Sequence, residues 1–142
     1  MIRLYEFGDS PCCMKVRIAL EEKGLPYERR FVTSWKFDHY QPEYQGLNPL
    51  SLVPTLVDSD GTTVIQSNVI LEYLDQRYRA PKLIPDDPRI AAHVRQWMVT
   101  EQDYLFPVIV TMSFHIMMKM RVDVFGLDRL KEWSSVFPDQ EM

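Results

Sequence analysis

Three residues with reactive or hydrogen-bonding side chains, Ser10, Cys12 and Cys13, lie at the start of a predicted helix. A helix N-terminus carries partial positive charge, so it favours an anion and lowers the pKa of a nearby thiol. A serine hydroxyl at that position can donate a hydrogen bond to a thiolate. Ser10 is therefore a candidate for thiolate stabilisation, and Cys12 is a candidate nucleophile. The alternatives are that Ser10 only caps the helix and that the cysteines are small buried residues, as we expect for Cys13.

Two further pairs of residues have the composition of a peptide-binding site. Val53-Pro54 opens a short predicted strand, and Gln66-Ser67 opens a later helix. A cis peptide bond before Pro54 would turn the backbone of Val53 outward, toward an extended peptide. Gln66 and Ser67, at a helix N-terminus, would bind a carboxylate. Each pair is common by itself, but with Ser10 they predict a site for a small peptide that has a free thiol and a free α-carboxylate.

The N-terminal half alternates between predicted strands and helices. Residues 2–7 form an apolar run that predicts a buried strand. We expect a helix over residues 12–23, with Ser10 as its N-cap and Pro11 at its first position. Residues 27–33 predict a second strand, parallel to the first because a helix connects the two.

A hairpin and a third helix follow. Residues 54–58 and 62–65 flank an Asp-Gly turn, so we expect an antiparallel pair. Ser67 is the expected cap of a helix that runs to about residue 78. This order of elements predicts an α/β fold, a small mixed sheet with helices on its faces.

The C-terminal part is predicted to be helical. Three prolines within residues 81–88 indicate a linker, over residues 80–87, between an α/β domain over 1–79 and a partial all-α domain over 88–142. Asp87-Pro88 begins a long helix, which we expect Pro107 to kink or end, and residues 127–133 predict a further short helix.

Composition excludes several classes of function. The 142 residues carry a formal net charge of −4 and no cluster of Lys and Arg, so nucleic acid is not an expected partner. Charges at Arg3, Glu6 and Asp9 interrupt any signal-peptide core, and no apolar run is long enough to span a membrane. Two adjacent cysteines offer no disulfide framework. We therefore expect a cytoplasmic protein that does not act on nucleic acid or in a membrane.

Three segments resemble glutathione transferases. They are residues 10–24 (SPCCMKVRIALEEKG), Asn48-Pro49 with residues 53–56, and residues 66–74 (QSNVILEYL). The Ser-x-Cys pattern is similar to that of the serine- and cysteine-type classes, near the zeta class and tetrachlorohydroquinone dehalogenase. The resemblance implies a thioredoxin-like N-terminal domain that binds glutathione, followed by an all-helical domain, which is truncated here.

The resemblance also implies a role for each site residue. Ser10 would stabilise the glutathione thiolate, and Cys12 matches the cysteine that forms a mixed disulfide with glutathione in the dehalogenase relatives. The implied glutathione-binding residues are Lys36, His39, Val53, Pro54, Gln66 and Ser67. Of these, Val53 would pair with the cysteinyl backbone beside a cis-proline at position 54. Gln66 and Ser67 would hold the γ-glutamyl carboxylate, and Lys36 or His39 would reach the glycyl carboxylate.

The implied activity is that of a glutathione transferase, acting in detoxification. Glutathione would serve as co-substrate, without a metal, and its thiol would attack an electrophilic aromatic or haloorganic substrate. The family also implies a homodimer. Two alternatives stay open: a Cys12-dependent, glutathione-linked reductase or dehalogenase, and a non-catalytic glutathione-binding interaction module.

Overall fold

The computed structural model describes residues 1–8, 10–33, 36–112 and 115–116. The chain divides into two compact units, residues 1–91 and 92–142. All of the predicted site residues lie in the first unit. The helix predicted over residues 127–133 lies outside the described residues.

The first unit is built on a four-stranded mixed sheet with the order β2-β1-β3-β4. The strands are β1 (Ile2–Glu6), β2 (Tyr27–Phe31), β3 (Thr55–Val57) and β4 (Thr63–Ile65). β1 pairs in parallel with β2, and β3 is antiparallel to both β1 and β4. The predicted parallel pair and the predicted hairpin are therefore both confirmed.

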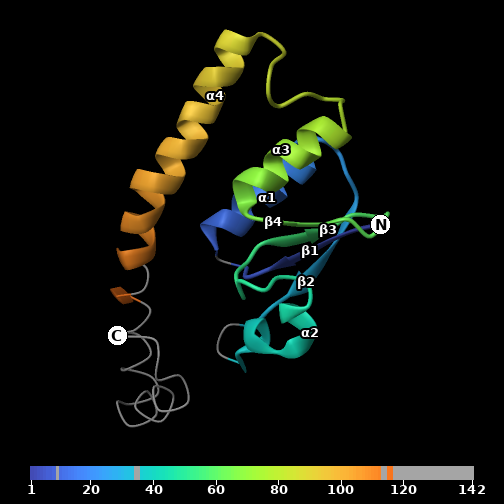
Figure 1. Ribbon diagram of the computed structural model, residues 1–142, viewed down its shortest axis with the longest axis vertical. Helices are drawn as coiled ribbons and strands as arrows, with labels where there is room; N and C mark the ends of the chain where they lie inside the picture. Colours follow the sequence, from blue (N-terminus) through green and yellow to red (C-terminus); the bar gives the residue numbers. More distant parts are fainter. Residues whose placement is uncertain (9, 34–35, 113–114, 117–142) are drawn as a thin grey trace. The chain divides into compact units, whose positions relative to one another are not determined.

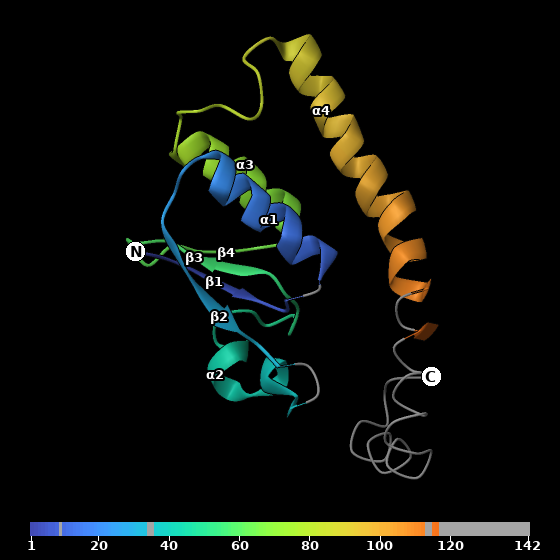
Figure 2. The ribbon, with the colours of Figure 1, turned by 180° about the vertical axis from the view of Figure 1, so that it is seen from behind.

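Helices cover the sheet unequally. α1 (Pro11–Glu22) and α3 (Ser67–Arg77) lie side by side on one face, and the short α2 (Pro42–Gln45) lies on the other (Figures 1 and 2). This is the thioredoxin-like arrangement expected from the sequence. The buried core between the sheet and the two long helices contains Ile2, Leu4, Val16, Ala19, Leu20, Leu56, Ile70 and Leu74.

A buried carboxylate fixes the end of the hairpin to α3. Asp58, whose side chain is inaccessible to solvent, accepts hydrogen bonds from the hydroxyls of Tyr73 and Tyr78, both at 2.6 Å, and from the N–H of Ser59 at 2.5 Å. Burial acts to raise the pKa of Asp58, but these hydrogen bonds outweigh it and hold the pKa below its usual value. The charged form is therefore the one that the fold favours.

This carboxylate predicts acid sensitivity. Because the pKa of Asp58 is lower in the folded chain than in the unfolded chain, its contribution to stability is complete above about pH 4 and declines as the pH falls through the folded-state value. The free energy of unfolding, measured by urea denaturation between neutral pH and about pH 2.5, should show this decline. In Asp58→Asn it should fall less steeply with decreasing pH. An equal slope in both proteins would contradict the prediction.

The second unit contains most of one long helix. α4 (Pro88–Thr100) continues through a π-helical turn, Glu101–Leu105, into helical residues 106–112. The helix therefore does not end at Pro107, which was one of the two outcomes expected from the sequence. In a regular helix the ring of Pro107 would clash with the carbonyl of Asp103, but here that carbonyl lies in the wider π-helical turn.

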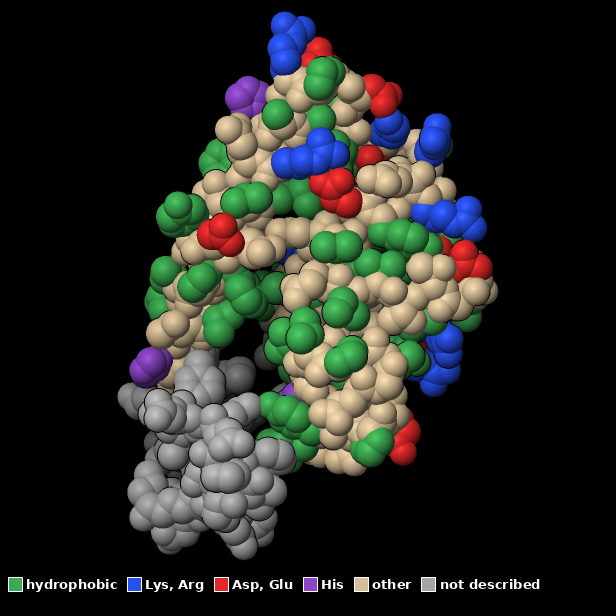
Figure 3. All heavy atoms as spheres, in the orientation of Figure 1, with side chains coloured by type: hydrophobic (Ala, Val, Ile, Leu, Met, Phe, Trp, Pro, Cys, Tyr) green, Lys and Arg blue, Asp and Glu red, His purple; other side chains and the backbone are tan. Residues whose placement is uncertain are grey.

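The surface of this helix is rich in apolar side chains (Figure 3). Trp97 is 70% exposed and Tyr104 is 71% exposed. No helix in the described part of the chain is both long enough and apolar enough to cross a bilayer.

Candidate functional site

Strand register brings the predicted site residues to one edge of the sheet. Tyr5 of β1 lies opposite Thr55 of β3, and Thr55 lies opposite Ile65 of β4. Because β3 is antiparallel to both neighbours, the end of β1, the start of β3 and the end of β4 are adjacent. Ser10 follows the end of β1 and Gln66-Ser67 follows the end of β4, whereas Val53-Pro54 comes immediately before the start of β3.

Ser10 is the N-cap of α1, as predicted. Its backbone is extended (φ −67°, ψ 122°), and its Oγ accepts a hydrogen bond from the N–H of Cys13 at 3.4 Å. Its own N–H donates to the carbonyl of Phe7, just after β1, at 3.3 Å. Accepting the capping bond uses an oxygen lone pair and not the hydroxyl proton, so the same side chain can still donate to an anion. Capping and thiolate stabilisation are thus compatible.

The two cysteines differ in their surroundings. Cys13 is fully buried, and this burial raises the pKa of its thiol to about 11. Cys12 is half-buried in the first turn of α1. The expectation that Cys13 is a buried cysteine is confirmed, and Cys12 is the more accessible of the two thiols.

This difference predicts selective alkylation. At pH 8, iodoacetamide should modify Cys12 at least tenfold faster than Cys13, because the thiolate is the reactive form and Cys13 is both buried and protonated. Mass spectrometry of the digested protein measures both rates. In Cys12→Ser the fast phase should vanish, whereas rapid labelling of Cys13 in the folded protein would contradict the assignment.

The peptide bond between Val53 and Pro54 is cis, as the resemblance implied. Pro54 is buried, whereas Val53 is half-buried. Among the residues that the structure describes, none forms a hydrogen bond with the backbone N–H or C=O of Val53. These two groups are therefore available to an extended peptide.

Two residues that were not assigned a role by sequence hold this loop in place. The buried Asn48 donates to the carbonyl of Leu52 at 2.7 Å and to Oγ1 of Thr55 at 3.0 Å. The hydroxyl of Tyr44, in α2, donates to the same carbonyl at 2.5 Å. The sequence signal was Asn48-Pro49 itself, a polar residue and a turn residue shortly before the cis-proline.

Gln66 and Ser67 lie at the start of α3, but the helix cap lies one residue earlier than expected. Gln66 is the N-cap, with a positive φ of 69°, and Ser67 is the first residue of the helix, so the prediction that Ser67 caps the helix is wrong. The reason is that β4 ends at Ile65, which leaves a single residue to turn the chain into α3. Gln66 makes no capping side-chain hydrogen bond, so its side chain does not occupy this helix N-terminus.

His39 and Lys36, the two residues expected to reach the glycyl carboxylate, differ in their surroundings. His39 lies in the 3-10 helix Asp38–Tyr40, and its ring packs edge-on against Phe7, with the ring centroids 5.7 Å apart. Its Nδ1 is buried without a hydrogen-bond partner in the described part of the chain, and burial lowers the pKa of the ring. Lys36 is exposed. His39 is therefore beside the end of β1 that leads to Ser10, whereas no side-chain hydrogen bond or ion pair with another described residue holds Lys36 there.

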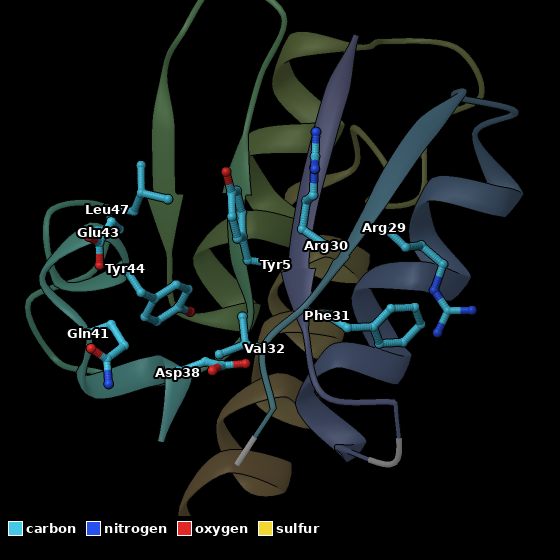
Figure 4. A pocket seen from close by; sticks show the side chains of 10 residues that line it. All are labelled: Tyr5, Arg29, Arg30, Phe31, Val32, Asp38, Gln41, Glu43, Tyr44 and Leu47. Atoms are coloured by element: carbon cyan, nitrogen blue, oxygen red, sulfur yellow. The ribbon is translucent and has the colours of Figure 1, made fainter. Parts of the chain in front are cut away.

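A groove of about 580 Å³ lies elsewhere, between β2 and the α2 region (Figure 4). Its wall includes Tyr5, Arg30 and Tyr44, and none of the predicted site residues lines it. The described residues contain no group of His, Cys, Asp or Glu side chains able to hold a metal ion. The chemistry available at the sheet edge is that of a hydroxyl, a thiol, backbone groups and helix N-termini.

Comparisons with known proteins match this architecture. Residues 9–77 match the family model described as glutathione S-transferase, N-terminal domain. A maleylacetoacetate isomerase from Mus musculus is 42% identical over 94 residues, which are 65% of this chain and 43% of that protein. The chain spans 38% to 45% of the length of the first curated relatives that it matches.

Solved structures of glutathione transferases also align with this chain. A maleylpyruvate isomerase, a bacterial glutathione S-transferase of the zeta class, aligns with a TM-score of 0.70 and 31% identity over 87% of this chain and 56% of its own. A glutathione transferase homologue from Sulfitobacter, solved with bound glutathione, aligns with a TM-score of 0.69 and 30% identity over 72% of this chain and 49% of its own.

Proposed function

Since residues 9–77 belong to the glutathione S-transferase family, we propose that this chain binds glutathione and activates its thiol for attack on an electrophilic small molecule. The observation that carries the proposal is the meeting of Ser10, Val53-Pro54 and Gln66-Ser67 at one edge of the sheet. Enzymatic activity, substrates and partners of the whole protein are all part of this proposal.

In the proposed complex the tripeptide lies across the sheet edge. Its cysteinyl backbone pairs with Val53, and its γ-glutamyl carboxylate lies at the first turn of α3, beside Gln66 and Ser67. Its glycyl carboxylate lies toward His39 or Lys36. The sulfur then lies at the start of α1, where the Ser10 hydroxyl donates to the thiolate and the helix N-terminus favours its negative charge.

The thiolate is the nucleophile of the proposed reaction. With an activated aryl halide it forms a carbon–sulfur bond and halide leaves. With a conjugated double bond it adds to one carbon, and its later elimination restores the alkene. The relatives named as maleylacetoacetate and maleylpyruvate isomerases support acceptors of this second kind. Detoxification, a cytoplasmic location and a homodimer, each typical of the family, complete the proposal.

Glutathione binding and turnover are separate tests. Titration calorimetry with millimolar reduced glutathione should show saturable binding to the folded protein, and a nitro-activated aryl chloride or a maleyl acid should be consumed in its presence. Binding without turnover of any electrophile would instead favour a non-catalytic binding module. A folded sample that releases no heat with glutathione would exclude the proposal.

The accessibility of Cys12 favours a second candidate function, glutathione-linked reduction or dehalogenation. The Cys12 thiolate would attack glutathione disulfide, forming a mixed disulfide and releasing one reduced glutathione. Mass spectrometry after treatment with glutathione disulfide would detect the adduct. Lack of an adduct, together with full activity of Cys12→Ser, would remove this candidate.

A further inference from the structure

A side-chain bridge joins the two helices whose N-terminal turns carry the proposed site. Nζ of Lys15, one turn into α1, donates a hydrogen bond to Oδ1 of Asn68 in the first turn of α3, at 2.8 Å. Lys15 is half-buried, and the two residues are 53 positions apart in sequence. The bridge is therefore a tertiary contact at the end of the helix pair where the site lies.

The opposite end of the same helix pair is held separately. Lys23, after the end of α1, pairs with Asp75 of α3 at 2.9 Å. Between the two bridges the helices share the apolar core. The Lys15–Asn68 bridge is thus not required to hold α1 against α3. Its position beside Ser67 indicates a role at the N-terminal ends of the two helices.

The two halves of the proposed site lie at these helix ends. Ser10, which in the proposed complex faces the sulfur, is the N-cap of α1, whereas Gln66 and Ser67, which would face the γ-glutamyl group, are the N-cap and the first residue of α3. One tripeptide must reach both halves together. A small shift of one helix start relative to the other therefore weakens the contacts at one end of the ligand.

We propose that Lys15, through Asn68, is a positioning residue that sets the spacing between the thiol half and the γ-glutamyl half of the site. The inference rests on the proposed function and deepens it, because it concerns selection of glutathione over shorter thiols. Lys15 itself need not touch the ligand. Its ammonium group can only donate, so it turns the carbonyl oxygen of the Asn68 amide toward α1.

Cysteinylglycine is the probe that separates positioning from general destabilisation. It has the thiol and the glycyl carboxylate of glutathione but lacks the γ-glutamyl group, so it does not engage the α3 half. The quantity measured is the preference for glutathione, defined as the ratio of kcat/KM with glutathione to kcat/KM with cysteinylglycine, using one aryl chloride acceptor.

In Lys15→Met this preference should fall about tenfold, mainly through a higher KM for glutathione, while kcat/KM with cysteinylglycine stays the same. Asn68→Ala should have a similar effect, and adding Lys15→Met to it should produce little further change. Lys15→Arg, which retains the charge and the donors, should recover part of the preference. Lys82→Met is the matched control, because Lys82 is exposed and pairs with Asp86, four residues away.

The outcomes separate the two proposals. An unchanged preference in Lys15→Met, or an equal loss with both thiols, would overturn the positioning role and leave glutathione binding intact. A wild-type protein that does not distinguish the two thiols would also overturn the positioning role, whereas one that binds neither thiol would overturn the proposed function. A thermal melt of each variant shows whether it remains folded.

Discussion

Replacing Ser10 by alanine is expected to lower kcat with glutathione about a hundredfold or more, while the Kd for glutathione stays within about threefold. In the proposed complex the hydroxyl stabilises the thiolate, so its loss should raise the apparent pKa of the bound thiol and reduce the fraction of nucleophile at neutral pH. Binding should be affected little, because in the proposed complex Val53 and the first turn of α3 hold the rest of the tripeptide. Steady-state kinetics across pH and calorimetry measure the two effects separately.

The capping role of Ser10 requires its own control, since Ser10→Ala also removes the acceptor for the N–H of Cys13. Loss of this cap should cost about 1 kcal/mol of stability. Ser10→Gly also removes the hydroxyl, but glycine at an N-cap should lower the stability by only a few tenths of a kcal/mol. Ser10→Thr keeps the hydroxyl. We expect Gly to behave like Ala in turnover and Thr to retain most activity, and full turnover in Ser10→Gly would refute the thiolate role.

The parts of the site that the sequence predicted correctly depend on local rules. A serine followed by a proline specifies a helix start, so Ser10 and Pro11 take the expected positions in α1. Asp60-Gly61 specifies the tight turn that pairs β3 with β4. These strand pairs in turn place Val53-Pro54 and Gln66-Ser67 at the same edge. Each step needs only a few neighbouring residues.

The parts that the sequence did not reveal depend on contacts between distant segments. The one-residue shift at α3 follows from where β4 stops pairing, which is a property of the hairpin partner and not of Gln66 or Ser67. The difference between His39 and Lys36 arises because Phe7, more than thirty residues earlier in the sequence, packs against His39. Lys15 appeared in the sequence only as one charge among many on a helix surface.

The second large effect is expected from Lys23. Its side chain is inaccessible to solvent, and its Nζ donates to Asp75 at 2.9 Å and to the carbonyls of Tyr78 and Pro81 at 2.8 and 2.7 Å. Lys23→Met would leave the buried Asp75 without its countercharge and both carbonyls without this donor. We expect it to lower the free energy of unfolding by about 3–5 kcal/mol, measured by urea denaturation.

The remaining partners of Asp75 determine how the loss can be recovered. Burial acts to raise the pKa of Asp75, but the N–H groups of Leu83 and Ile84 and the ammonium of Lys23 together hold it below its usual value. Removing both charges, as in Lys23→Met with Asp75→Asn, should therefore be less destabilising than Lys23→Met alone, since no buried charge is left unpaired. Lys82→Met, an exposed lysine, should change stability by less than about 0.5 kcal/mol. If Lys23→Met unfolds at the same urea concentration as the wild type, the contacts of its ammonium group do not stabilise this end of the α1–α3 pair.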